Sequence, residues 1–308
     1  MATLYGQNFR ILTYDSSTEK YSVVGMATNC TVNLNTNTDD GSNKDITGMA
    51  ARPNVMSKNW QVSVESLNVA DIYAILSAVK ASTPFVLLWD ETNTSNNQTA
   101  KNEGFCRRGT AFLSDVTFQF DNRTNSTKSL QFSGTGALEK LSQTPTVQTI
   151  SPSNTYTQGQ YVRLFLSSDN TTASNSVIAA ARTLSFHCSV QLEDATTKDT
   201  VGDWQVQEPI GISFDISTSA LVRSGETITS QVGAKSLADL MDIYEASSPI
   251  RFSIANVEGD NNRARTTVII TGSVIIASIA INAANRQVTT YDAQFQGYGS
   301  LGLTPPNS

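Results

Sequence analysis

The chain has 308 residues, enough for two domains of about 150 residues each. Charged residues make up only 16% of it, the net charge is −6 and no basic cluster occurs, which argues against tight binding of a nucleic-acid backbone. The N-terminus lacks the charged and apolar regions of a signal peptide, and no apolar run is long enough to span a membrane. We therefore expect a soluble protein that folds in a cytoplasm.

The chain begins with strands and a long polar stretch. Residues 8–34 are rich in strand-forming side chains, whereas residues 35–58 are polar. The polar stretch contains the turn signal Asp39-Asp40-Gly41 and then the pattern Lys44-Asp45-Ile-Thr-Gly48. We interpret it as a long loop between two strands, and such loops in compact domains are usually functional. A solvated turn is the simpler interpretation of the Lys-Asp-x-x-Gly pattern.

A strand and a helix come next. Residues 60–64 alternate apolar and polar side chains, as in a half-buried strand. Asn68, with Asp71 three residues later, predicts a capping box at the start of a helix. One face of that helix is apolar and is expected to pack on the sheet; it consists of Val69, Ile72, Leu76 and Val79.

A second strand and a polar loop follow the helix. Pro84 ends the helix, and residues 85–89 are predicted to form the strand. Residues 91–104, which include Asn96 and Asn97, are polar and contain no apolar anchor. We expect this loop, like the one over residues 35–58, to contact other chains.

The most regular part of the first half is a hairpin over residues 109–138. Its outgoing strand has an alternating apolar face made of Val116, Phe118 and Phe120. A polar run over 121–127 supplies the turn, and the return strand carries Phe132 and ends in Gly134-x-Gly136. Two glycines one residue apart indicate a bend or a close backbone approach. A phosphate-binding fingerprint needs a third glycine and a following helix, and neither is present.

The same hairpin occurs again over residues 272–301. The two segments align without a gap at an offset of 163 (272 − 109), and nine of 30 positions are identical. Unrelated segments match at about one position in fifteen to twenty, so the unit is interpreted as a duplication. The strand and glycine positions of the second copy are Ile279, Ile281, Phe295, Gly297 and Gly299.

Other segments of the first half also have counterparts. Residues 9–12 match residues 162–165, and a second polar stretch contains Lys198-Asp199-Thr-Val-Gly202. The alternating segment over 212–216 places Ile212 where the first half has Trp60. Cys30 can be matched with Cys188 or, at the offset of the surrounding region, with Leu184, so this register stays open.

The second half also has one helix, preceded by Ser236 and Asp239 in the spacing of a capping box. Its apolar face is predicted to pack on the sheet and consists of Leu237, Leu240, Met241 and Tyr244. The uncharged, proline-containing stretch over 141–160 is predicted to be a linker. We therefore divide the chain into a first domain over 1–140, the linker, and a second domain over 161–308.

The sequence offers little for catalysis or metal binding. His187 is the only histidine and lies in an apolar-alternating segment, so we interpret it as structural. Cys30, Cys106 and Cys188 have no metal-ligand spacing and are predicted to be buried, reduced thiols. No nucleophile elbow, phosphate-binding loop or Cys-x-x-Cys motif occurs, and we expect neither an enzyme nor a cofactor.

The order of these elements resembles the major tail tube proteins of long-tailed bacteriophages. The closing motifs, residues 131–138 and 294–301, carry the resemblance in both halves. The pairs Lys44-Asp45 and Lys198-Asp199 resemble the charged pair that opens a long inter-strand loop in that family. Trp60 fits the aromatic residue after this loop, and Ile212 departs from it. The resemblance extends over nearly the whole chain, once in each half.

The resemblance implies a mainly β fold of two tandem β-sandwich or rolled-sheet domains, each with one flanking helix and a long hairpin. It implies a structural virion protein, made in the host bacterial cytoplasm, that assembles with itself and with other tail proteins into stacked rings. The rings form the tail tube, through which double-stranded DNA is ejected without specific binding. No membrane is involved.

We predict a ring of three chains in which six domains have pseudo-sixfold symmetry. The alternative is a ring of six chains with the second domain outside. Other classes are a distal tail or baseplate ring protein of the same fold, a capsid-decorating or adhesin-like binding module, and a hydrolase on a β scaffold. The residues predicted to contact neighbouring chains or rings are Asp39, Asp40, Lys44, Asp45, Gly48, Asn96, Asn97, Lys198, Asp199 and Gly202.

Overall fold

The computed structural model confirms a mainly β protein with two α-helices in the described part of the chain. The residues described are 6, 9–15, 19–24, 27–41, 52–67, 69, 71–92, 100–101, 106–141, 157–171, 176–200, 202–222, 234–257 and 265–304. The predicted site residues Lys44, Asp45, Gly48, Asn96 and Asn97, and most of the predicted linker, lie outside these ranges.

The strands and helices follow one another in a similar order in the two halves. Those of the first half are β1 (Phe9–Asp15), β2 (Lys20–Val23), β3 (Ala27–Asp40), β4 (Pro53–Ser66), α1 (Ile72–Lys80), β5 (Phe85–Thr92), β6 (Ala100–Lys101), β7 (Arg107–Asp121) and β8 (Thr127–Lys140). Those of the second half are a 3-10 turn (Gly159–Tyr161), β9 (Val162–Leu166), β10 (Ser176–Ile178), β11 (Ala181–Asp194), β12 (Gln207–Leu221), β13 (Ala234–Lys235), α2 (Leu237–Ala246), β14 (Ile250–Val257), β15 (Arg265–Asn282) and β16 (Thr290–Leu303).

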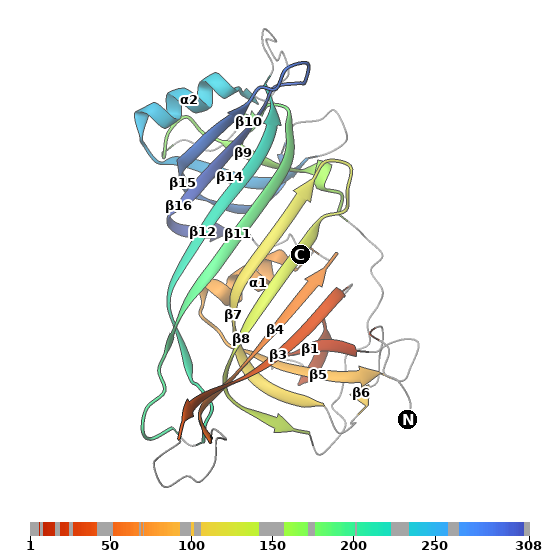
Figure 1. Ribbon diagram of the computed structural model, residues 1–308. Helices are drawn as coiled ribbons and strands as arrows, with labels where there is room; N and C mark the ends of the chain where they lie inside the picture. The colour runs from red at the N-terminus through yellow and green to blue at the C-terminus, as the bar shows by residue number, and fades with distance from the viewer. Residues whose placement is uncertain are drawn as a thin grey trace.

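Eight strands of 14–18 residues form one continuous antiparallel sheet, which we call the wall. Their order is β3-β4-β8-β7-β11-β12-β16-β15. Figure 1 shows these strands side by side along one diagonal of the view, through both halves, with α1 near the middle and α2 at one end. The two halves therefore share a sheet in addition to the chain connection.

One face of the wall is apolar and the other is polar. Residues that alternate along the strands, such as Val62, Phe132, Phe118, Phe186 and Ile216, are fully buried on the apolar face. They belong to one hydrophobic cluster with α1 and with short strands of both halves. We call this the core face and the opposite one the bare face. The period of two in the sequence thus predicted the burial of the hairpin strands correctly.

The second half repeats the pairing irregularities of the first. Ser114 of β7 and Ala277 of β15 are the extra residues of β-bulges and differ by the hairpin offset of 163 (277 − 114). Arg123 and Arg286, one in each hairpin turn, both have a positive φ, of 64° and 61°. The two copies thus agree in backbone conformation as well as in sequence. The division of the chain into two domains stays a prediction.

The strand pairing shows which residues of β3 and β4 are equivalent to which residues of β11 and β12. Val62 pairs with Phe132, and Ile216 pairs with the equivalent Phe295, which gives an offset of 154 (216 − 62). Trp60 therefore corresponds to Phe214, and the match with Ile212 was wrong by two residues. At the same offset Cys30 corresponds to Leu184. The match of residues 9–12 with 162–165 agrees with the pairing of Ile11 with Trp89 and Leu164 with Ile254.

The loops between the wall strands are shorter than predicted. Asp39 and Asp40 are still paired in β3, opposite Asn54 and Pro53, so half of the polar stretch over 35–58 is strand. In the same way β11 continues to Asp194. Asn and Thr side chains favoured the loop interpretation, but cross-strand hydrogen bonds such as Asn35 Nδ2 to Asn59 Oδ1, at 3.1 Å, stabilise strands here.

The two helices match their predictions unequally. The predicted capping box is present in α2, where Ser236 and Asp239 bond reciprocally. In α1 the cap is Asp71 itself, which makes no side-chain capping bond because its carboxylate binds Lys128 instead. The apolar face of α1 is buried as expected, but Met241 and Tyr244 of α2 are exposed, so that part of the packing prediction was wrong.

Candidate assembly interface

The two halves meet where β7 pairs with β11, and we call this contact the seam. Along one edge, β7 first pairs with β5 over residues 107–111 and, after the bulge at Ser114, with β11 over residues 115–121. The register sets Phe118 opposite Phe186 and Asp115 opposite Ser189. The bulge changes the direction of the strand, so that β7 pairs first with β5 of its own half and then with β11 of the second half.

The core side of the seam is fully buried. Phe118, Phe186 and Cys188 are each at most 1% exposed. Helix α1 lies over this region and contacts β16 of the second half. Lys80 Nζ, in its last turn, donates a hydrogen bond of 2.8 Å to the carbonyl oxygen of Leu301. The seam therefore resembles the interior of a single domain.

On the bare face, a row of three titratable side chains crosses the seam. His187 Nε2 lies 2.6 Å from Asp115 Oδ2 on β7, and His187 Nδ1 lies 2.6 Å from Asp215 Oδ1 on β12. Partial burial alone would lower the pKa of His187, but the hydrogen bonds to the two carboxylates outweigh it, and the net effect raises the pKa above its ordinary value.

This arrangement explains the lone histidine without catalysis. Both ring nitrogens are bound to carboxylates, so neither is available to take a proton from a substrate. Burial raises the pKa of Cys188 to about 12, so the neighbouring thiol is a poor nucleophile. Cys30 is only half-buried, which corrects its prediction as a buried thiol, while Cys106 and Cys188 are buried as expected.

A segment of the second half, residues 203–207, lies across the first half and forms a strap. Lys58 N donates to Asp203 O at 2.6 Å, and Gln205 N donates back to Lys58 O at 3.0 Å. Gly136 N donates to Gln205 O at 2.8 Å. The charged groups of Lys58 and Asp203 pair at 3.1 Å, but both are substantially exposed, so the backbone bonds contribute most of the stabilisation.

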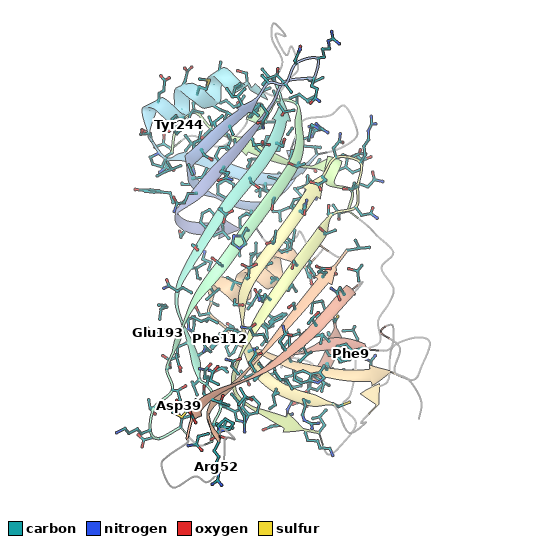
Figure 2. The ribbon with its side chains drawn as sticks, viewed as in Figure 1. Phe9, Asp39, Arg52, Phe112, Glu193 and Tyr244 are labelled. Atoms are coloured by element: carbon teal, nitrogen blue, oxygen red, sulfur yellow. The ribbon has the colours of Figure 1, made fainter. Side chains whose placement is uncertain are left out.

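The predicted loop residues of the second half lie next to this strap. Lys198 and Asp199 are in an exposed turn, and Gly202, with φ of +88°, turns the chain into the strap. Figure 2 shows Asp39, Arg52 and Glu193 at this same end of the wall. The structure thus brings the second Lys-Asp-x-x-Gly motif to the boundary between the halves.

The wall has two outer edges that are unpaired among the described strands. β3 pairs only with β4, and residues 278–282 of β15, beyond its pairing with β14, have a partner only in β16. At the two offsets, β3 corresponds to β11 and β15 corresponds to β7. The outer edges are therefore the same two strand types that already pair with each other in the seam.

Apolar residues mark both outer edges. Leu34 on β3 is 61% exposed, whereas the equivalent seam residue, Cys188 (188 − 34 = 154), is 1% exposed. Ile281 on β15 is 50% exposed, whereas the equivalent Phe118 (281 − 118 = 163) is 0% exposed. Exposed apolar strand edges favour pairing with another chain. A mainly β protein with two such edges is suited to assemble through its strands.

Among the described residues, no group of three or more His, Cys, Asp or Glu side chains has the arrangement of a metal site. None of the helices in the described ranges has the length and hydropathy needed to cross a membrane. No protein-family model matches the chain, and no curated protein matches it.

Three solved structures are similar to about half of the chain. One is the tail of an empty gene transfer agent particle with C6 symmetry, at 18% identity and a TM-score of 0.37 over 48% of this chain and 99% of that chain. Another is the virion of a native gene transfer agent, at 17% and 0.34 over 48% and 99%. The third is the SPP1 tail tube, at 15% and 0.36 over 49% and 80%.

Proposed function

We propose that this protein is a structural component of a phage tail that assembles into rings, and that stacked rings form the tail tube for DNA ejection. The observation that carries the proposal is the seam between the halves. In the seam, β7 pairs with β11 within one chain. The equivalent strands at the outer edges, β15 and β3, can pair in the same way between two chains. The distal tail or baseplate ring protein of the same fold remains the alternative.

The seam gives the register of the proposed contact. In the seam, Phe186 pairs with Phe118, so the equivalent residues Val32 and Ile281 of neighbouring copies face each other. Leu184 pairs with Phe120, so Cys30 faces Ala283 of the next copy. The contact is head-to-tail, and repetition of a head-to-tail contact closes a ring when the rotation allows it.

Three copies satisfy the geometry that the resemblance implies. Each half contributes four wall strands in the same order, and the seam makes the two halves consecutive units of one sheet. Six units around the lumen then require three chains. Closing the sheet leaves no unpaired edge, which removes the hazard that Leu34 and Ile281 present in a monomer.

The bare face of the wall lines the lumen in this arrangement, because the core face is covered by helices and short strands. The bare-face rows are mainly Ser, Thr, Asn and Gln, and their titratable groups include Glu65, Asp115, Asp121, His187, Asp215 and Asp292. Carboxylates repel phosphates, so this wall does not hold DNA. Assembled protein should therefore show no tight, salt-sensitive binding of duplex DNA in a filter or mobility assay.

A disulfide tests the proposed strand contact. Ala283→Cys places a thiol opposite native Cys30 of the neighbour, and we expect mild oxidation at about pH 8.5 to link three chains in denaturing electrophoresis. Alkaline pH is needed because burial raises the pKa of Cys30. Asn282→Cys is the control, since its side chain points to the other face of the strand. Absence of cross-linking in Ala283→Cys refutes the register, and a product of six chains refutes the three-chain ring.

A further inference from the structure

The exposed side of α2 has a buried counterpart in α1. The two helices correspond at an offset of 165 (247 − 82), since Ser82 and Ser247 follow them with positive φ of 51° and 49°. Met241 is 43% and Tyr244 is 51% exposed, whereas the equivalent Leu76 and Val79 are 0% and 5% exposed. The same helix face is therefore buried in one half and open in the other.

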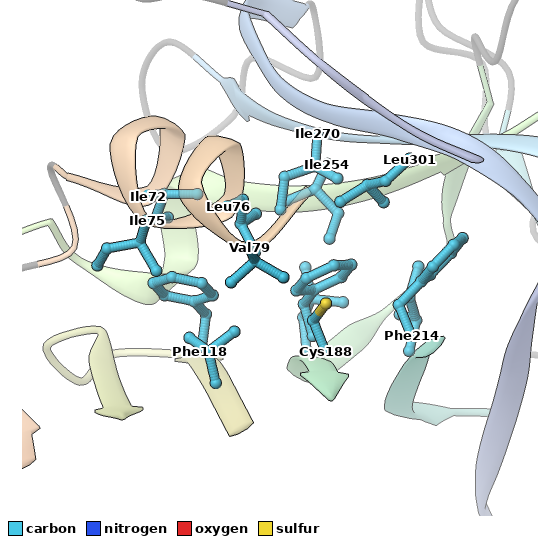
Figure 3. Close-up of a cluster of buried hydrophobic side chains, with 14 of the residues drawn as sticks. Ile72, Ile75, Leu76, Val79, Phe118, Cys188, Phe214, Ile254, Ile270 and Leu301 are labelled. Atoms are coloured by element: carbon cyan, nitrogen blue, oxygen red, sulfur yellow. The ribbon is translucent and has the colours of Figure 1, made fainter. Parts of the chain in front are cut away.

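Part of the cover of α1 comes from the second half of the chain. Figure 3 shows Leu76 and Val79 beside Ile254, Ile270 and Cys188, and all five belong to one hydrophobic cluster. Within the described part of the chain, no further unit covers α2 in the way that the second half covers α1. What lies over α1 therefore shows what is missing over α2.

The equivalent receiving surface exists on the first half. Ile270 and Leu301 lie near α1 in Figure 3, and Leu303 is the register partner of Ile270. At the offset of 163 (270 − 107), these three residues correspond to Arg107, Leu138 and Lys140. Arg107 and Lys140 are register partners on β7 and β8. The three residues of the second half are thus all apolar, whereas the equivalent residues of the first half are two basic residues and one leucine.

The charge on the helix changes in the opposite sense. Lys80, which binds the Leu301 carbonyl in the seam, corresponds to Glu245 on α2 (245 − 80 = 165). Asp242 is a further exposed carboxylate on this helix. An acidic residue cannot donate to a carbonyl, but it is complementary to Arg107 and Lys140. The two differences between the halves compensate each other.

We propose that the outer face of α2, formed by Met241, Tyr244 and Glu245, docks on the Arg107–Leu138–Lys140 surface of a second copy of this chain. This contact rests on the proposed ring. It is a second contact between neighbouring chains, in addition to the pairing of their edge strands. The apolar residues supply buried area, and the opposite charges select the outer surface of the first half over other faces.

A charge exchange tests the docking. Glu245→Lys and Lys140→Glu should each raise the protein concentration needed for half-assembly by about tenfold or more, because like charges are brought together at every contact between chains. The double variant should restore assembly toward the wild-type concentration. Glu19→Lys, in an exposed turn of the first half, makes the same change of charge at a residue that belongs to neither surface and is the control. Sedimentation velocity measures all four.

The outcomes separate this contact from the proposed ring. If Ala283→Cys cross-links to Cys30 but Glu245→Lys assembles like the wild type, the α2 docking is wrong and the ring stands. Weakened assembly in Glu245→Lys that Lys140→Glu does not restore also overturns the docking. If the wild-type chain stays monomeric at all concentrations, both proposals fall.

Discussion

Trp60 determines which residues its neighbours on β7 and β8 can be. A Cβ atom on Gly134 would lie 2.1 Å from the indole ring, and one on Gly109 would lie 2.4 Å from it. In the second half Phe214 takes the same role, with a Cβ on Gly297 only 2.6 Å from its carbonyl oxygen. Gly136 and Gly299 have open space but φ of +73° and +75°. The Gly-x-Gly motif thus combines a close approach with a left-handed turn.

Gly134→Ala should therefore destabilise the fold. Overpacking of a filled core costs about 1–3 kcal/mol, and the indole of Trp60 is too rigid to relax easily. Gly211→Ala is the control, because its nearest atom would be 3.7 Å away, and it should change stability by less than about 0.5 kcal/mol. Urea unfolding at a concentration where the protein is monomeric compares the two. Equal stability of the variants would show that the contact does not matter.

His187 should make stability depend on pH. Its pKa is raised in the folded protein, so the stabilisation is complete below the unfolded pKa of about 6.5 and is lost as the pH rises through the folded pKa. His187→Asn, which introduces the residue of the equivalent Asn33, should lower the melting temperature most below about pH 6. The effect should be less than about 1 kcal/mol, because the side chains are partly exposed. A difference between the variants that is independent of pH contradicts this role.

At the scale of secondary structure, the sequence predicted the two hairpins but not the pairing between strands that are far apart in the chain. A shift of two residues keeps every side chain on the same face, so Ile212 fitted the place of Trp60 as well as Phe214 did. The bulge at Ser114 and the pairing of β7 with β11 involve residues far apart in the chain, which local patterns cannot show. Asp115 and Asp215 were missed as partners of His187 for the same reason.

The helix patterns likewise predicted an apolar face without its cover. Leu76 and Met241 occupy equivalent positions in similar amphipathic helices, yet only Leu76 is buried. Packing against another part of the fold decides such burial, and α2 lacks that part within one chain. The sequence alone therefore predicted the same environment for both helices.

The start of α1 depends on a buried ion pair in place of the predicted capping box. Lys128 is 0% exposed at its side chain and binds Asp71, which is 40% exposed. Asp71→Ala leaves the ammonium group buried without a partner and should cost about 3 kcal/mol or more. Lys128→Met should cost much less, and the double variant should resemble it. Equilibrium unfolding of the three variants tests this. If Asp71 acted only as a helix cap, the double variant would resemble Asp71→Ala instead of Lys128→Met.

At the scale of the whole molecule, the two halves are similar in fold and different in surface. The seam inside the chain has Asp115, His187 and Asp215 on its bare face, whereas the equivalent outer-edge residues are Ser278, Asn33 and Gln61. In the proposed ring of three chains, charged seams within chains would alternate with neutral contacts between chains.

The central claim is that three chains close a ring of six equivalent units, and end-on class averages of the purified protein by electron microscopy test it most directly. We expect six equal densities at one radius around a lumen, with the mass of three chains of 33.2 kDa each. An inner ring of six densities surrounded by six outer lobes, the pattern of six chains with the second half outside, would contradict it.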